Sequence, residues 1–257
     1  MKETPETRAN IEKTWAEATA AQPRLWNQSK YRLAGQAYTE GRGPLLRVAV
    51  TDYKDHVGTN LGPEVDQWVG KGEERWAYMA QCIGVGCWLV SSDSKVVLVE
   101  TASWKGEQGC KVDRPGGHAE PQESLALLPE TQNDVAYLTP DLVKRELFEC
   151  IQKEVRDEIN IPLASQTRPE MLGVVINTEK GGRLSLEFFI KVEEDSGKIR
   201  DLYTEGGPEA DESTNIFFVD LEDVKREQVD PAIRSRFTPH AKGSIELLRR
   251  MLADSSA

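Results

Sequence analysis

The sequence KEVRDEINIP, residues 153–162, has the pattern of the last turns of an amphipathic helix. Glu154, Asp157 and Glu158 lie three and four residues apart, so on a helix they fall within an arc of about 100°. Like charges at this spacing repel, and the C-terminus of a helix disfavours negative charge. Because Mg²⁺ and Mn²⁺ prefer carboxylate oxygens, this face is a candidate site for a divalent cation. The alternative is a solvated acidic face.

An apolar stripe runs beside these acids. Its members recur every three or four residues, at Phe148, Ile151, Val155 and Ile159. Such a stripe would dock the helix on a sheet. Asp141 is the expected N-cap of this helix, and Pro162 is expected to stop it.

Expected strands and helices alternate along the rest of the chain. Helices are expected over 7–19, 63–79 and 242–252. Strands are expected over 30–53, with a turn at 41–44, and within 83–103, as a pair joined at 91–95. Further strands are expected over 171–177, 184–192 and 216–221. Loops are expected over 52–60 and 124–140. This mixed order predicts an α/β layered fold, with a lobe boundary near residue 80.

Composition excludes several classes of protein. Of 257 residues, 39% are hydrophobic and 29% are charged, which is typical of a soluble globular protein with a real core. No apolar stretch is long enough to span a membrane, and the polar N-terminus resembles neither a signal nor a transit peptide. Four cysteines without a CxxC pair predict reduced, mostly buried thiols. We therefore expect a cytoplasmic protein, with nuclear access open and with no membrane partner.

The net charge of −11 disfavours binding to nucleic acid. It would also repel a phosphate-bearing substrate unless bound cations reverse the local field. The sequence leaves the choice between monomer and dimer open.

A second motif lies upstream of the acidic helix. Residues 116–123, GGHAEPQE, resemble the opening of the nudix box, and residues 153–161 resemble its close. Lys153 stands where the family has Arg, and Asn160 stands where it has Gly, a position that Asn tolerates because it can adopt the left-handed conformation. Residues 124–152 replace the family's short spacer, so the usual contact between the positions of Glu123 and Lys153 is not predicted here.

The split box resembles one branch of the superfamily, the nudix-type motif 22 group of UDP-glucose diphosphatases. The similar stretches are TDYKDHVGTN, RPGGHAEPQ, ELFECIQKEVRDEINIP, GGPEADESTNIFFV and the final AKG. The resemblance implies a nudix α/β/α sandwich with a mixed sheet over residues 81–257, containing the split box at 116–161. It also implies an N-terminal α+β lobe over residues 1–80 that contributes to substrate binding.

The activity implied is Mg²⁺-dependent hydrolysis of UDP-glucose or UDP-galactose to UMP and sugar 1-phosphate, with Mn²⁺ as a substitute. By position, Glu154 and Glu158 would be the main metal ligands and catalytic residues. Asp157 would assist them, and the carbonyl of Gly117 would be a further ligand. Two alternatives stay open: a nudix hydrolase of ADP-ribose or coenzyme A, and a catalytically inactive protein that binds nucleotide sugars.

Residues outside the acidic helix are candidates for substrate binding. Arg114 could clamp a phosphate, with a surface salt bridge as the alternative. Gly58, Thr59 and Asn60 could bind substrate through backbone or side chains, or could form an ordinary turn. Tyr53 could stack on a base, although a core role is favoured for it.

Further candidates lie in the opening half of the box and beyond the box. Glu212, in an acidic loop that also contains Glu209 and Asp211, could be a general base or an extra ligand, or could be solvated. Glu187 could face the site or form an edge-strand salt bridge. For His118 a structural hydrogen bond is favoured over catalysis.

Overall fold

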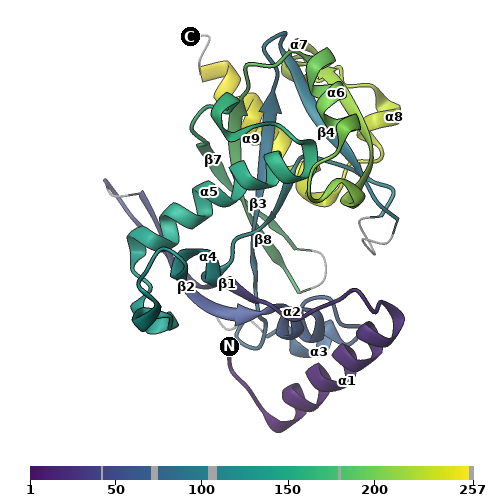
Figure 1. Ribbon diagram of the computed structural model, residues 1–257. Coiled ribbons are helices and arrows are strands. Elements are labelled where there is room, and N and C mark those ends of the chain that lie inside the picture. Colours follow the sequence, from purple (N-terminus) through teal and green to yellow (C-terminus); the bar gives the residue numbers. More distant parts are fainter. Residues whose placement is uncertain (42, 71–74, 104–108, 179–180, 255–257) are drawn as a thin grey trace. The chain divides into compact units, whose positions relative to one another are not determined.

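The structure, a computed structural model, describes residues 1–41, 43–70, 75–103, 109–178 and 181–254 (Figure 1). The chain forms two compact units, each built from several segments. The first contains Met1–Gly84, His118–Glu146 and Ile176–Leu184; the second contains Val85–Gly117, Leu147–Val175 and Ser185–Ala257. The first unit thus extends the lobe expected over residues 1–80 by two later segments. It takes His118–Glu146 from the split box, while Gly117 and the acidic helix face belong to the second unit.

The first unit begins with helix α1, Pro5–Ala21, which Thr4 caps by accepting the backbone N–H of Thr7. Strands β1, Ser29–Thr39, and β2, Gly43–Asp52, pair antiparallel in a two-stranded sheet. The helix expected over 7–19 and the strands expected over 30–53 are therefore confirmed.

Helix α2, Tyr53–Thr59, occupies the stretch expected to be a loop, so that prediction was wrong. The carboxylate of Asp52 accepts the N–H of Asp55 at 2.8 Å and caps the helix, an N-cap signal that the sequence did contain. The prediction of a helix over 63–79 was also wrong. Within its described part only α3, Val65–Trp68, is α-helical, because the backbone is already extended at Val69, just before Gly70.

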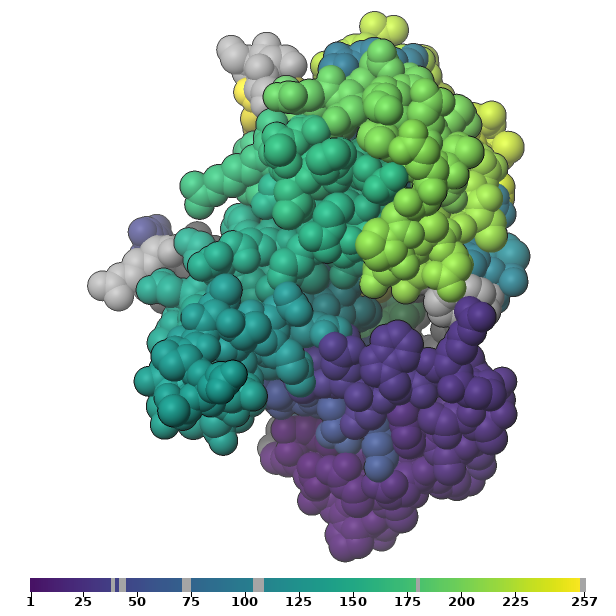
Figure 2. Space-filling model, in the orientation of Figure 1, coloured from purple at the N-terminus to yellow at the C-terminus, as the bar shows by residue number. Residues whose placement is uncertain are grey.

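Most of the segment that separates the two halves of the box, residues 124–146, belongs to the first unit. It contains helix α4, Pro121–Leu125, and two short 3₁₀ turns, η3 at Glu130–Gln132 and η4 at Val135–Tyr137. The loop expected over 124–140 therefore contains local structure. Asp134 caps η4 by accepting the N–H of Ala136. This teal part of the chain lies at the surface in Figure 2.

A seven-stranded sheet forms the core of the second unit, and several of its strands extend into the first. The order is β5-β4-β3-β8-β7, with β6 paired to β3 and β9 paired to β4. The strands are β3, Ile83–Val90; β4, Lys95–Thr101; β5, Val112–Asp113; β6, Gly116–His118; β7, Glu170–Asn177; β8, Arg183–Lys191; and β9, Ser213–Asp220. The strand pair expected within 83–103 is confirmed as β3 and β4, which pair antiparallel.

Two long helices cover this sheet: α5, Pro140–Ile159, and α9, Pro239–Asp254. Successive strand residues point to opposite faces, so Phe188 and Phe189 of β8 do so too. Phe188 meets Phe148 of α5 edge-on, with ring centroids 5.0 Å apart. Phe189 belongs to a buried cluster with Ala241 and Leu248 of α9. The helices therefore cover opposite faces of the sheet, as expected for an α/β/α sandwich (Figure 1).

The ends of α5 explain how the acidic face is placed. The hydroxyl of Thr139 accepts the N–H of Leu142, so the expected N-cap at Asp141 was wrong by two residues; Asp141 lies in the first turn instead. At the other end Asn160 has φ +66°, the left-handed conformation predicted for it, and its amide donates to the carbonyl of Leu202. Three members of the predicted apolar stripe, Ile151, Val155 and Ile159, are fully inaccessible to solvent, and Phe148 is half-buried.

Several short elements were not expected. They are α6, Ser196–Glu205; α7, Leu221–Lys225; α8, Pro231–Arg234; and the 3₁₀ turns η5, Leu163–Ser165, and η6, Ala210–Glu212. All four cysteines are free, and Cys110 is exposed, unlike the other three. Within the described residues, no helix has the length and apolarity needed to cross a membrane.

Candidate active site

The Gly116–Gly117 turn, part of β6, lies close against strand β3. The carbonyl of Pro115 accepts the N–H of Cys87 at 2.9 Å. A Cβ on Gly116 would overlap the carbonyl oxygen of Val85. Glycine is therefore required at this position by the close approach of two backbones.

Two acids of α5 converge on this turn. Glu158 is buried, and its Oε2 accepts the backbone N–H of Gly116 at 3.1 Å. The carboxylate of Glu154 lies against Gly117, where a Cβ would overlap it, and the thiol of Cys150 donates to the Oε1 of Glu154 at 3.7 Å. The structure thus brings together both predicted metal ligands and the glycine that was predicted beside them.

Asp157 shares the acidic face but has other partners. Its carboxylate forms two hydrogen bonds of 2.6 Å with the guanidinium of the adjacent Arg156. Its carbonyl oxygen accepts the N–H of Glu209 at 3.0 Å, and a Cβ on Gly207 would overlap that same oxygen. The acidic loop around residue 209 is therefore held against the last turn of α5. A role for Asp157 in binding metal stays a prediction.

The loop's remaining acids lie in and beside η6. The carbonyl of Glu212 accepts the N–H of Ala102 at 2.9 Å, and its side chain is half-buried, while Asp211 is exposed. The structure therefore fixes the backbone at Glu212, and the role expected for its carboxylate stays a prediction.

Arg114 lies in a buried ion cluster, not at the surface. Its Nε and Nη2 donate to the two carboxylate oxygens of Glu187 at 2.9 and 2.6 Å, and Nη1 donates to Asp113 at 2.8 Å. Arg114 is 7% exposed and Glu187 is fully buried. Burial raises the pKa of Glu187, but the charge of Arg114 and the hydrogen bonds from Arg114 and Ser185 together outweigh burial and lower that pKa. A phosphate clamp by Arg114 would require these contacts to break.

In the first unit, Thr59 and Asn60 are buried and hydrogen-bonded to backbone. Thr59 donates to the carbonyl of Asp55 and accepts the N–H of Ala80. The amide of Asn60 donates to the carbonyls of Gly181 and Gly182 at 2.9 and 3.0 Å. Thr59 and Asn60 are each only 1% exposed, so this geometry supports a structural role for both side chains.

Gly58 and Tyr53 lie on the same short helix. A Cβ on Gly58 would come within 2.6 Å of the Cα of Ile11, so glycine allows α1 and α2 to pack closely. Tyr53 is half-buried, and its ring is edge-on to Trp15 with centroids 6.3 Å apart.

His118, which follows the glycine pair, is half-buried beside His56, with ring centroids 6.3 Å apart. Burial lowers the pKa of His56 to about 3, so this histidine is neutral at physiological pH. The other signature residues of the box belong to different units: Glu123 is exposed on α4 in the first unit, and Lys153 is half-buried on α5 in the second.

A divalent cation suits the donor set at this turn. Among the residues that the structure describes, no group of three or more His, Cys, Asp or Glu side chains is arranged to hold a metal. Glu154 and Glu158, however, offer two carboxylates with hard oxygen atoms beside a glycine that has no room for a side chain. Mg²⁺ commonly keeps several waters and is held by one or two carboxylates, so two acids are sufficient for it.

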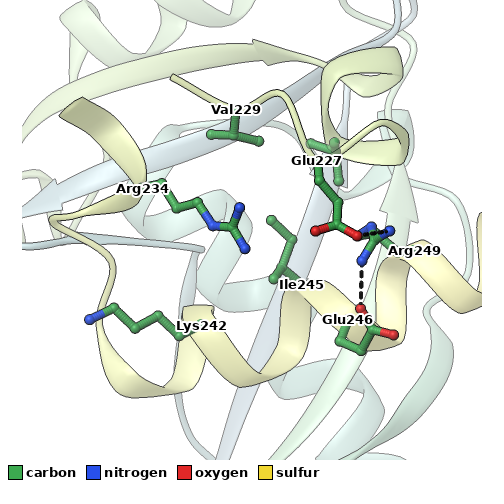
Figure 3. Close-up of a pocket in the computed structure, with 8 residues that line it drawn as sticks. Glu227, Val229, Arg234, Lys242, Ile245, Glu246 and Arg249 are labelled. Atoms are coloured by element: carbon green, nitrogen blue, oxygen red, sulfur yellow. Dashed lines mark hydrogen bonds and ion pairs between the residues drawn. The ribbon is translucent and has the colours of Figure 1, made fainter. Parts of the chain in front are cut away.

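A pocket of about 380 Å³ lies elsewhere in the second unit, between α7, α8 and α9 (Figure 3). Its lining residues are Val224, Glu227, Val229, Arg234, Lys242, Ile245, Glu246 and Arg249. None of them is a predicted site residue. Arg249 is paired with Glu227 at 2.5 Å and with Glu246 at 2.8 Å, which neutralises its charge.

No family model matches the chain. A human protein named uridine diphosphate glucose pyrophosphatase NUDT22 is 37% identical over 245 residues, which cover 92% of this chain and 80% of that protein. Its bovine namesake is 36% identical over 250 residues, and a protein of Arabidopsis thaliana named Nudix hydrolase 9 is 27% identical over 228 residues. The chain therefore belongs to the nudix hydrolase superfamily and, within it, to the group of the NUDT22 proteins.

Solved structures with a similar fold are nudix proteins of much lower identity. A nudix hydrolase from Nitrosomonas europaea has a TM-score of 0.42 and 16% identity, covering 65% of this chain and 88% of that one. The nudix domain of NrtR from Shewanella oneidensis, complexed with ADP ribose, has a TM-score of 0.41 and 15% identity, covering 74% and 99%.

Proposed function

We propose that this chain hydrolyses the diphosphate of UDP-glucose or UDP-galactose to UMP and sugar 1-phosphate, with Mg²⁺ or Mn²⁺ as cofactor. The observation that carries the proposal is the approach of Glu154 and Glu158 to the Gly116–Gly117 turn. The choice of substrate is supported by the name of the human and bovine relatives.

Glu154 and Glu158 would hold the cation, with the carbonyl of Gly117 and the carboxylate of Asp157 as further candidates. When bound, a divalent cation polarises phosphoryl oxygens and lowers the pKa of a bound water. The two acids lie on consecutive turns of a helix whose apolar side is buried, so the sheet holds them in place.

The protein's own groups have two further tasks in this proposal. The backbone of the glycine pair would lie beside the bound diphosphate. Glu212 would accept a proton from the attacking water, whose oxygen bonds to one phosphorus while the bond from that phosphorus to the bridging oxygen breaks. The phosphate on the other side of the bridge then leaves.

The lobe over residues 1–80 is proposed to contribute to substrate binding. Within it Tyr53 is a better candidate than Thr59 or Asn60, because the side chains of Thr59 and Asn60 are buried in internal hydrogen bonds. Base stacking on a half-buried tyrosine would be a low-specificity contact.

A substrate panel tests the proposal. The protein is incubated with Mg²⁺ and UDP-glucose, UDP-galactose, ADP-ribose or coenzyme A, and release of UMP or of an adenine nucleotide is followed. The variants Glu154→Gln and Glu158→Gln are assayed alongside Glu170→Gln, an exposed glutamate of β7 that serves as the control. We expect UMP from the two UDP-sugars and loss of turnover in the first two variants only. Turnover of ADP-ribose alone would refute the substrate assignment.

A further inference from the structure

The buried pair of Arg114 and Glu187 lies next to the glycine turn but has no task in the reaction described above. A fully desolvated ion pair gains little stability over apolar residues of the same size. Its presence therefore calls for a reason other than stability. The contacts around the pair indicate that reason.

Strand β3 provides room for the guanidinium. A Cβ on Gly86 would overlap Arg114, so only glycine fits at that strand position. On the other side, Ser185 and Glu187 of β8 accept from the guanidinium, Ser185 at 3.0 Å. Asp113 accepts both from the guanidinium and from the backbone N–H of Arg114, at 2.8 and 2.9 Å. The backbone of residue 114 is consequently held along with its side chain.

This anchored backbone leads directly into the turn. The carbonyl of Pro115 accepts the N–H of Cys87 in β3. The N–H of the next residue, Gly116, donates to the carboxylate of Glu158. Only one residue separates the anchored Arg114 from the donor that meets the acid. A shift of Arg114 would therefore lengthen the bond between Gly116 and Glu158 and would move Gly117 relative to Glu154.

We propose that Arg114 and Glu187 are positioning residues that fix the Gly116–Gly117 turn against Glu154 and Glu158. The competing role, direct binding of a substrate phosphate by Arg114, would not need Glu187. The proposal rests on the proposed function for its kinetic readout only; its structural readout is independent of any substrate.

Amide hydrogen exchange of Gly116, followed by NMR, gives the structural readout. The variants are Glu187→Gln, which preserves shape, Arg114→Lys and Arg114→Met. The control is Leu248→Ala, which removes a buried side chain from the core of the same unit without touching the turn. Urea denaturation gives the global stability of each variant. We expect Gly116 to exchange about tenfold faster or more in the pair variants than in a control of equal stability.

Kinetics with UDP-glucose give the second readout. We expect Glu187→Gln and Arg114→Met to lower kcat strongly and to leave KM within about twofold, because the turn and not the substrate is displaced. An unchanged rate of Gly116 exchange in both Glu187→Gln and Arg114→Met would overturn the proposal. So would a raised KM in Arg114→Met together with full activity in Glu187→Gln, which would indicate a phosphate clamp. If the wild type shows no turnover, the proposed function fails, and the exchange of Gly116 still decides the positioning role.

Discussion

The carboxylate of Glu154 occupies the space that a side chain on Gly117 would need. One residue comes from helix α5 and the other from strand β6, and residues 124–152 lie between the two halves of the motif. The insertion therefore leaves intact the approach of the acidic helix to the glycine turn.

Replacement of Gly117 by alanine tests this relationship. The new methyl group would push the Glu154 carboxylate aside, and misplacement of about 1 Å can lower turnover about 100-fold. We expect such a loss of kcat with a stability loss of about 1–3 kcal/mol, measured by urea denaturation. The control is Gly35→Ala, where a Cβ would come no closer than 3.6 Å to Arg47. Full activity in Gly117→Ala would show that Glu154 is not needed where the structure places it.

The left-handed residue at the end of α5 gives a second prediction. Asn160→Gly keeps the backbone conformation and loses only the bond to Leu202, whereas Asn160→Val must adopt a φ of +66° with a branched side chain. We expect the free energy of unfolding of the valine variant to be about 1–2 kcal/mol lower than that of the glycine variant. Equal stability of the two would contradict the conformation described for residue 160.

Substitution of Asn60 distinguishes a structural role of this residue from a role in substrate binding. Removal of its amide in Asn60→Ala leaves the N–H of Gln81 and the carbonyls of Gly181 and Gly182 without this partner. We expect a loss of about 1–3 kcal/mol in the free energy of unfolding, with KM for UDP-glucose unchanged. Asn133→Ala, at an exposed asparagine of the same unit, is the control. A raised KM at unchanged stability would reinstate the substrate role expected from the sequence.

Acid sensitivity should arise in part from His56. Its pKa is lowered from 6.5 to about 3 by burial, so the folded protein holds it neutral while the unfolded chain protonates it. Its contribution to stability is therefore complete above pH 6.5 and is lost as the pH falls toward 3. We expect the free energy of unfolding to fall by roughly 1 kcal/mol per pH unit between pH 6 and 4 from this group. In His56→Leu the slope should decrease by that amount; an unchanged slope would refute the assignment.

The sequence was sufficient for the features that depend on local spacing. The acidic face of α5, its apolar stripe and the left-handed Asn160 follow from helical periodicity and from the conformational tolerance of asparagine. The pairing of β3 with β4 follows from two apolar runs joined by a short polar turn.

Features that depend on distant partners were not predictable in this way. Whether Arg114 is exposed depends on Glu187, which is far away in the sequence, and on the space left by Gly86. The burial of Asn60 likewise depends on carbonyls at 181 and 182. The helix at Tyr53–Thr59 was missed for a different reason. Asp52 is a recognisable N-cap residue, but the Gly, Asn and Asp content of residues 52–60 favoured a loop prediction.

The rate of UMP release from UDP-glucose by the wild type and by Glu158→Gln, measured across a Mg²⁺ titration, tests the proposed metal site most directly. We expect wild-type turnover that requires Mg²⁺ and that falls about 100-fold or more in Glu158→Gln, because the side chain that accepts the N–H of Gly116 would lose its charge. Wild-type turnover without a divalent cation, or an unchanged rate in Glu158→Gln at every Mg²⁺ concentration, would contradict it.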